Sequence, residues 1–343
     1  MTIDEQYMLR CLELAQLGIG PAAPNPSVGC VIVHNGQVIG EGYTSAFGGP
    51  HAEVNAINAV QNKELLPDST VYVSLEPCAH FGKTPPCADL LVASDVKRVV
   101  IGCQDPFAKV NGAGIERLKN AGIDVSVGIL EEACKEMNRR FFTFHEKKRP
   151  YIILKWAETE DGFVDHIRSE KKQKPLKITG KTSSALVHKW RTEEASILVG
   201  KNTVLADDPA LTSRHYKGKN PIRIVLGSIE NENQNLHIFD GTAETLIITE
   251  NRHDFPNSET IVVDDTKHFD AVLDALYDRN ILSILVEGGP TIHQWFYENA
   301  YDEIRKFVSP MKINSGIPAI RLEIEPNEVQ KVGNDHLYVY HNR

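Results

Sequence analysis

Short apolar runs alternate with segments of helical periodicity along the whole chain, and the alternation is interrupted once. Val28–Val33 and Val71–Leu75 are typical runs of the first half, and Ile222–Leu226 and Ser283–Val286 are typical of the second. Strands separated by helices favour an α/β fold built on a layered sheet. The interruption is the charged segment His145–Pro150, which ends in proline and is predicted to be a linker.

The expected elements follow from this pattern. Helices are expected at 4–17, 51–61, 88–93, 114–121, 131–144, 183–191, 269–279 and 292–298. Strands are expected at 28–33, 38–40, 71–75, 99–101, 123–127, 151–156, 197–199, 222–226, 246–249, 261–263, 283–286, 304–308 and 337–340, with Asn35 and Gly36 in a hairpin turn. A chain of 343 residues is long enough for two domains, and we expect them at 1–145 and 150–343.

The charge balance limits the partners of the chain. Lys and Arg number 37 against 46 Asp and Glu, which gives a net charge of −9. This balance argues against a main role in binding nucleic-acid phosphates or an anionic membrane. The first residues contain an acidic pair, and no stretch has the roughly 18 to 20 apolar residues that span a bilayer. We therefore expect a cytoplasmic protein without nucleic-acid or membrane partners.

The six cysteines are too few for a disulfide scaffold, and their spacing is uneven. Four of them are scattered among apolar or helical segments and are expected to be plain thiols: Cys11, Cys30, Cys103 and Cys134. Cys78 and Cys87 differ, because they lie close together and each follows a proline. These two cysteines are the candidates for chemistry.

His51, Cys78 and Cys87 are predicted to bind a zinc ion. They offer one imidazole and two thiolates, and a catalytic zinc site keeps its fourth position for water, whose pKa falls to about 7. Glu53 is expected in the first turn of a helix that starts at His51, where it faces the water and moves its proton to a leaving amine. Both cysteines are expected to precede or open a helix, whose N-terminus favours the thiolate.

Two alternatives to a catalytic zinc site stay open: two unrelated thiols, or a closed, structural zinc site. A closed, structural zinc site would need a fourth ligand, and His80 is the nearest candidate, but Glu53 would then have no purpose. The arrangement His-x-Glu with Pro-Cys and a second Cys is the signature of zinc nucleobase deaminases, although eight residues rather than two separate these cysteines. The loop 24–29 is either a plain turn or a segment in which Asn25 hydrogen-bonds a substrate ring.

Six segments, spread over nearly the whole chain, carry one family resemblance. Those of the first half are PNPSVGCVIV (24–33), HAEVNAI (51–57) and SLEPCAHFGKTPPCADLL (74–91). Those of the second half are VHKWRTEEASILVGKNTVLADDPALTSR (187–214), NPIRIVL (220–226) and VEGGPT (286–291). With these segments the chain resembles the bifunctional deaminase-reductases of riboflavin biosynthesis. The resemblance implies an α/β chain with a cytidine-deaminase-like three-layer domain followed by a dihydrofolate-reductase-like domain.

The resemblance also implies two reactions. The first is the hydrolytic deamination of 2,5-diamino-6-ribosylamino-4(3H)-pyrimidinone 5′-phosphate, and the second is the NADPH-dependent reduction of its ribosyl group to a ribityl chain. In the family pattern His51, Cys78 and Cys87 bind one zinc ion and Glu53 moves the proton. Asn25 and Lys83 match substrate contacts, and a lysine suits a phosphate.

Read from its residues, the second half offers a different way to hold a dinucleotide from the Rossmann motif. No Gly-x-Gly-x-x-Gly follows a strand. Two glycines, Gly288 and Gly289, instead separate a strand from a helix that starts at Pro290, a place where backbone N–H groups can meet a phosphate. Without the resemblance, a tight strand-to-helix turn explains the same residues.

The resemblance assigns roles in the second half. It implies NADPH contacts at Thr203, Asp207, Ser228, Gly289, Pro290 and Thr291, substrate contacts at Arg191, Leu211, Arg214 and Glu287, and a hydride-transfer site next to Lys155 and Glu287. Read alone, either arginine is a solvated charge and Asp207 starts a turn. The family resemblance further implies a homo-oligomer, a dimer or a tetramer.

Three departures from the family pattern lie in the second half. Glu160 replaces an apolar residue, a tryptophan is missing from the segment that ends Lys177-Ile178-Thr179, and 310–316 is less apolar than usual. They leave open a deaminase with an inactive reductase-like domain. A nucleic-acid base deaminase with an accessory domain is the other alternative, and the net charge argues against it.

The basic stretch 168–177 is expected to be an exposed loop. Its alternative role is to reach the extra phosphate of the cofactor.

Overall fold

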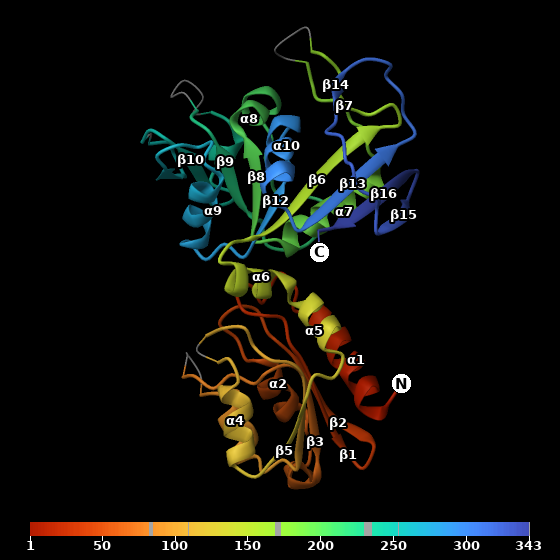
Figure 1. The fold of residues 1–343 in the computed structure, drawn as a ribbon, viewed down its shortest axis with the longest axis vertical. Coiled ribbons are helices and arrows are strands. Elements are labelled where there is room, and N and C mark those ends of the chain that lie inside the picture. Colours follow the sequence, from red (N-terminus) through yellow and green to blue (C-terminus); the bar gives the residue numbers. More distant parts are fainter. Residues whose placement is uncertain (82–84, 109, 169–172, 230–234, 253, 343) are drawn as a thin grey trace. The chain divides into compact units, whose positions relative to one another are not determined.

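The computed structural model describes residues 1–343 except 82–84, 109, 169–172, 230–234, 253 and 343 (Figure 1). The chain divides into two compact units, Met1–Lys148 and Arg149–Arg343. Within the described residues, no helix is long and apolar enough to cross a membrane.

The first unit is a five-stranded sheet with helices on both faces. Its elements are α1 (Ile3–Gln16), β1 (Gly29–His34), β2 (Gln37–Tyr43), α2 (Ala52–Ala59), the 3-10 helix η1 (Lys63–Asp68), β3 (Thr70–Leu75), α3 (Cys87–Ala93), β4 (Arg98–Cys103), α4 (Ala113–Asn120), β5 (Asp124–Val127), α5 (Glu131–Met137) and α6 (Arg139–Lys147). The strand order is β2-β1-β3-β4-β5, with β3, β4 and β5 parallel.

Two glycines show how closely the layers of this unit approach. A Cβ at Gly29 would lie 1.9 Å from the Cys11 carbonyl oxygen of α1, and a Cβ at Gly42 would lie 2.4 Å from the Ala52 carbonyl oxygen of α2. Gly42 pairs with Cys30, the residue after Gly29, and successive residues of a strand face opposite sides. Helices α1 and α2 therefore cover opposite faces, which confirms the predicted three-layer domain.

Two sequence expectations for this unit are wrong in detail. The helix expected at 131–144 is two helices that meet at Asn138, whose side chain accepts from the Ser27 backbone N–H (2.8 Å) and donates to the Ser27 carbonyl (3.0 Å). The predicted linker is helical as far as Lys147, because α6 continues through the charged residues. Helix α6 is followed by Lys148, whose backbone is in the left-handed conformation, and the first unit ends at the same residue.

The second unit is a nine-stranded mixed sheet with helices on both faces (Figure 1). Its elements are β6 (Tyr151–Thr159), β7 (Phe163–Asp165), α7 (Lys181–Glu193), β8 (Ser196–Gly200), α8 (Lys201–Asp207), β9 (Ile222–Leu226), the 3-10 helix η3 (His237–Phe239), β10 (Thr245–Thr249), β11 (Glu259–Val262), α9 (Phe269–Tyr277), β12 (Ser283–Val286), α10 (Pro290–Asn299), β13 (Glu303–Ser309), β14 (Ile317–Pro318), β15 (Glu328–Val332) and β16 (Asp335–His341). The order is β11-β10-β9-β8-β12-β6-β13-β16-β15, and only the last two strands run antiparallel to their neighbours.

Alternate residues of β6 supply two separate cores. Ile152 and Leu154 belong to a cluster that includes residues of α9 and α10, whereas Tyr151 and Ile153 belong to a cluster with residues of α7. A strand with period two thus buries both of its faces. The long parallel part of the sheet brings the carboxyl ends of β8, β9, β10 and β12 to one edge, where ligands of open α/β sheets bind.

Candidate functional site

The first unit brings His51, Cys78 and Cys87 together. His51 is the residue before α2, Cys78 lies in the irregular segment after β3, and Cys87 is the first residue of α3. Their ligand atoms all lie within 4.8 Å of one another. The expectation that Cys78 also precedes or opens a helix is wrong, since α3 starts nine residues later.

Helix α3 nevertheless serves both cysteines. The backbone N–H of Cys87, at the start of the helix, donates to the Cys78 sulfur at 3.2 Å, and the next N–H, of Ala88, donates to the Cys78 carbonyl at 3.1 Å. The N–H groups at a helix start have no partner within the helix and favour negative charge. Cys78 therefore contacts the start of α3, although eight residues separate the two cysteines.

The distances fit a zinc ion. His51 Nδ1 lies 3.7 Å from Cys78 Sγ and 3.4 Å from Cys87 Sγ. With Zn–S near 2.3 Å and Zn–N near 2.1 Å, a tetrahedral ion separates a nitrogen from a sulfur ligand by roughly 3.5 Å. Among the described residues these three alone form such a group, so one position of a tetrahedron is left for another ligand. His80 is outside the group, and its ring packs edge-on against Phe107 at 5.8 Å.

The ionisable groups at this site shift one another's pKa values. The pKa of the Cys78 thiol is lowered to about 4 by its hydrogen bond with Cys87 and by His51, while Cys78 and burial raise the pKa of Cys87. A bound dication deprotonates coordinating thiols outright, so both cysteines can ligate as thiolates. Glu53 is 4% exposed, and burial, followed by the charge of Cys78, raises its pKa to about 7.

The remaining predicted residues of this unit are placed unequally. Asn25 is half-buried in the loop before β1, and its backbone N–H donates to the Ala22 carbonyl. Lys83 lies outside the described residues. The four cysteines expected to be plain thiols are all buried and free, and burial raises the pKa of each.

Glu76 supports the site and was not predicted. Its buried carboxylate accepts from the backbone N–H groups of Asp105, Gly112, Gly114 and Ile115, at 2.9 to 3.2 Å. Two of these donors lie in the first turn of α4, where a carboxylate is favourable. The only sequence signal was an acidic residue between an apolar run and Pro77-Cys78.

In the second unit, a cavity of about 1370 Å³ opens at the carboxyl ends of the parallel strands. Lys155 and Glu287 line it from neighbouring strands: Leu154 of β6 pairs with Val286 of β12, so the residues that follow them lie side by side. Lys155 Nζ is 3.3 Å from the Glu287 carboxylate. The family resemblance implied that both residues belong to one site, and the register of β6 and β12 explains why they lie close together.

The predicted cofactor residues line the same cavity: Thr203, Asp207, Ser228, Gly289, Pro290 and Thr291. Pro290 is the first residue of α10, and the Gly289 N–H before it donates to Thr203 Oγ1 at 3.1 Å. Gly288 has a packing role, because a Cβ there would lie 3.0 Å from the Gly200 backbone nitrogen. A Cβ at Gly289 would meet only Thr203 Oγ1, at 3.5 Å, so its backbone is the more open of the two.

Asp207 is held by the basic stretch. Arg168 lies 2.6 Å from Asp207, lies 2.5 Å from Asp165 and donates to the Ala206 carbonyl. Its side chain is only 16% exposed. The expectation of an exposed loop at 168–177 is therefore wrong for Arg168, although Lys177 is exposed and lines the cavity. Residues 169–172 lie outside the described residues.

The predicted substrate residues occupy three environments. The Arg191 side chain is only 12% exposed and bonds Glu287, which excludes the alternative of a solvated charge. Leu211 packs its side chain into the core and has a left-handed φ of 52°. Arg214 is exposed, and its backbone N–H donates to His188 Nδ1.

Two of the departures from the family pattern face each other away from the core. The Glu160 side chain is 54% exposed and lies 3.4 Å from Lys312. The neighbouring Asp161 accepts from the backbone N–H groups of Ile313 and Asn314. Glu160 and the less apolar 310–316 segment thus form one polar contact, and neither Glu160 nor Lys312 lines the cavity.

Comparisons with known proteins agree on both units. The family model "Cytidine and deoxycytidylate deaminase zinc-binding region" matches residues 1–103, and "RibD C-terminal domain" matches 150–337. Riboflavin biosynthesis protein RibD of Aquifex aeolicus is 38% identical, with 97% of each chain covered, and that of Escherichia coli is 38% identical, with 91% of this chain and 89% of the other covered.

Solved structures agree over almost the entire chain. The diaminohydroxyphosphoribosylaminopyrimidine deaminase/5-amino-6-(5-phosphoribosylamino)uracil reductase of Thermotoga maritima is 36% identical with a TM-score of 0.88, and one structure of Acinetobacter baumannii RibD is 32% identical with a TM-score of 0.88. Each comparison covers 98% of both chains.

Fold and site together define a two-site enzyme in which a zinc-dependent deaminase is joined to an NADPH-dependent reductase. The chain belongs to the family of bifunctional riboflavin-biosynthesis deaminase-reductases. The fold class, the two cofactors and the small-molecule class of substrate expected from the sequence are confirmed.

Proposed function

We propose that the first unit deaminates 2,5-diamino-6-ribosylamino-4(3H)-pyrimidinone 5′-phosphate and that the second reduces the ribosyl group of the product to a ribityl chain. One observation carries the proposal: a single chain holds a His/Cys/Cys group beside Glu53 and a strand-edge cavity lined by Lys155 and Glu287. Family membership over the full length supports both steps.

In the deaminase unit, His51, Cys78 and Cys87 hold the zinc ion. The ion, when bound, lowers the pKa of a water molecule toward neutrality and so makes the nucleophile available. Glu53, in the first turn of α2, accepts the proton of that water and delivers it to the amine, which leaves as ammonia. Asn25 hydrogen-bonds the pyrimidine ring, and Lys83 meets the substrate phosphate.

In the reductase unit, the cavity would hold NADPH, which supplies the hydride when bound. The open backbone of Gly289, Pro290 and Thr291 at the start of α10 meets a cofactor phosphate, with Thr203, Asp207 and Ser228 along the same wall. Lys155 and Glu287 hold the charge and the proton that the ring opening of the ribosyl group requires. Arg191, Leu211 and Arg214 bind the substrate, with the arginines on its phosphate.

A paired assay on one zinc-analysed sample tests both steps. We expect ammonia release from the diaminopyrimidine ribotide, followed by NADPH oxidation that depends on the deaminated product. Ammonia release without NADPH oxidation would contradict the reductase step. RNA as the only substrate serves as the control and should release no ammonia.

Two properties of the whole molecule are part of the proposal. We propose a cytoplasmic enzyme, supported by six cysteines that are all free. We also propose a homo-oligomer, a dimer or a tetramer, supported by β15, the last strand at one edge of the nine-stranded sheet, where Val329 is 50% exposed. Light scattering on the purified protein tests the second statement, and a monomeric mass would contradict it.

A further inference from the structure

The segment 208–214 after α8 has an unusual backbone. Asp208 and Leu211 both have left-handed φ values, 42° and 52°, which non-glycine residues rarely adopt. Such conformations persist when surrounding contacts fix them, and they concentrate at functional sites. The segment carries Leu211 and Arg214, two of the substrate residues proposed above, and the contacts that fix it come from other elements.

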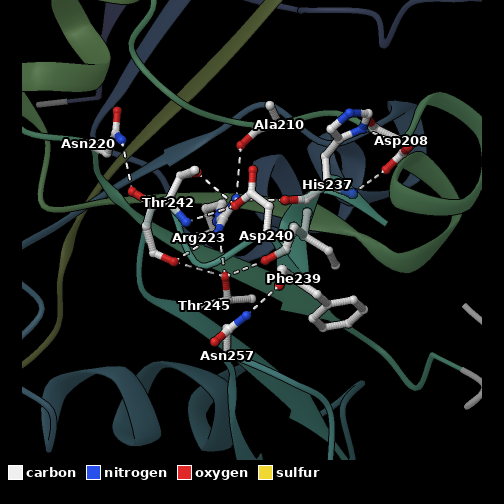
Figure 2. A network of polar contacts seen from close by, with 12 residues as sticks. Asp208, Ala210, Asn220, Arg223, His237, Phe239, Asp240, Thr242, Thr245 and Asn257 are labelled. Carbon is white, nitrogen blue, oxygen red and sulfur yellow. Dashed lines mark hydrogen bonds and ion pairs between the residues drawn. The ribbon is translucent and has the colours of Figure 1, made fainter. Parts of the chain in front are cut away.

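Arg223 fixes the first half of the segment. The side chain is fully buried on β9, and its guanidinium donates to the carbonyls of Ala210 (3.3 Å), His237 (3.0 Å) and Ala243 (2.7 Å) (Figure 2). Its other donors meet the Thr245 hydroxyl and the Asp240 carboxylate, both at 3.0 Å. The Arg223 side chain is 0% exposed, so the guanidinium is out of reach of a ligand.

The network extends to the start of the segment. The Asp208 carboxylate accepts from the His237 backbone N–H and contacts His237 Nδ1, both at 2.7 Å, and the His237 carbonyl accepts from Arg223 (Figure 2). Ala210 is thus bonded directly to the buried Arg223 guanidinium, and Asp208 is linked to it through His237.

His188 fixes the second half from α7. Its Nδ1 accepts from the Arg214 backbone N–H at 3.0 Å, and its carbonyl accepts from the Ser213 hydroxyl at 3.0 Å. An acceptor at Nδ1 requires the ring to be neutral with its proton on Nε2. Burial, followed by the charges of Arg191 and His215, lowers the pKa of His188 to about 4 and keeps it neutral.

The segment also touches the proposed reaction site. Arg191 donates to the Thr212 carbonyl at 3.0 Å and at the same time to the Glu287 carboxylate, which lines the cavity. A shift of 208–214 would therefore move Arg214 and disturb Arg191 together.

We propose that Arg223 and His188 are positioning residues of the reductase: they hold the segment 208–214 from behind, so that Arg214 and the Leu211 backbone meet the substrate phosphate. The inference rests on the proposed function, since it needs Arg214 to contact the substrate. Neither residue touches the ligand. Their effect is on the affinity for the ribosyl substrate, and the binding of NADPH and the deaminase do not depend on them.

The test uses the full chain with His188→Ala, His188→Asn, Arg214→Ala and the double variant His188→Ala/Arg214→Ala. We expect His188→Ala to raise the reductase KM for the deaminated substrate about tenfold, with a much smaller change in kcat. Asn offers an acceptor oxygen near the position of Nδ1, so His188→Asn should return KM to within about twofold of the parent value. The Kd of NADPH, from a fluorescence titration, and ammonia release should not change.

The double variant separates this inference from the proposed function. If His188 acts through the segment that carries Arg214, the rise in KM of the double variant is smaller than the two single effects combined, whereas fully additive effects would overturn the inference. A raised KM in Arg214→Ala with a normal KM in His188→Ala would overturn the inference and leave the proposed function standing. A normal KM in Arg214→Ala would refute the proposed role of Arg214 and the inference with it.

Two further variants complete the design. Lys189→Ala removes the exposed neighbour of His188 on α7 and is expected to leave all four readouts unchanged. Arg223→Lys keeps the buried charge but loses the fork of donors, so we expect a raised KM for the deaminated substrate. The thermal midpoint of this variant is measured alongside, to show that it is folded. If this variant does not fold, the His188 series still decides the proposal.

Discussion

Arg191 and Glu287 form a two-point ion pair in the reductase unit. Arg191 Nε and Nη2 each lie 2.9 Å from a different oxygen of the Glu287 carboxylate. Burial alone would raise the pKa of Glu287, but Arg191 and Lys155 hold it well below its usual range. The residue proposed to bind the substrate phosphate is therefore the same one that keeps a proposed reaction-site carboxylate ionised.

This pair makes Arg191→Ala a two-part prediction. The reductase KM should rise at least about tenfold, because a phosphate contact is lost, and kcat should also fall, because Glu287 keeps only Lys155 as its cation. Steady-state NADPH oxidation measures both, and ammonia release should stay at the parent rate. Equal losses in both activities would show that Arg191 maintains the fold and does not act in one site.

Local pattern was sufficient for the elements that bury a regular face. The strands next to the cavity and the helices α1, α7, α9 and α10 were predicted within a few residues, because their apolar residues repeat at strand or helix spacing. Strands β7, β14 and β15 were missed: β7 has only three residues, and β14 and β15 are largely exposed, so none carries such a repeat. The break between α5 and α6 was missed because it depends on Asn138 bonding Ser27, 111 positions away in the chain.

The same limit applies to the sites. His51, Cys78 and Cys87 were predictable because metal ligation requires particular side chains at particular spacings. Glu76 and Arg223 were not, because each acts by bonding backbone groups that only the fold brings together. Backbone donors and acceptors are the same at every residue, so no sequence motif marks them.

Glu53→Gln is predicted to separate zinc binding from catalysis. The three ligand atoms are unchanged, so the variant should keep one zinc per chain, but an amide cannot take up and release the proton. Ammonia release should fall by about 10²- to 10⁴-fold, the range for a lost general acid–base group. Elemental analysis and an ammonia assay test this. Glu64→Gln, at an exposed residue of η1, is the control, and near-normal ammonia release by Glu53→Gln would overturn the role of Glu53.

Cys87→Ser is predicted to lose the metal. Cys87 supplies one of three ligand atoms, and the described group holds no further side chain that could replace its sulfur. Zinc content should drop well below one per chain and deamination should cease, while NADPH oxidation on supplied intermediate continues. Full zinc occupancy in this variant would show that the ligand set is wrong. Cys134→Ser, at a buried thiol outside the group, is the matched control.

Glu160→Leu is predicted to be nearly neutral. The side chain is half exposed, and its contact with Lys312 is a surface ion pair, which contributes at most about 1 kcal/mol. The reductase kcat/KM should therefore stay within about twofold, and the thermal midpoint should move little. A reductase made several times faster by the apolar residue would mean that Glu160 impairs the site and that the departure from the family pattern has a functional cost.

His293 is predicted to make the reductase unit less stable in acid. Its ring is 3% exposed on α10 and bonds the Val286 carbonyl through Nε2 at 3.1 Å. Burial, together with the nearby charge of Lys155, lowers its pKa to about 4, whereas an unfolded histidine titrates near 6.5. Between these values the unfolded chain binds a proton that the native state does not. The contribution is therefore complete above about pH 6.5 and is lost as the pH falls toward 4, with a total on the order of 3 kcal/mol.

The tryptophans allow this loss to be measured in the full chain. Trp156, Trp190 and Trp295 are the three tryptophans of the protein, and all lie in the second unit, so their fluorescence reports its unfolding in urea. His293→Gln keeps a donor for the Val286 carbonyl without a titrating ring, so its stability should fall less than that of the parent between pH 7 and pH 5. His336→Gln, at an exposed residue of β16, should follow the parent. Equal pH dependence in all three proteins would refute the assignment, because only the parent and His336→Gln keep the neutral buried ring at position 293 and should lose the stability linked to its protonation.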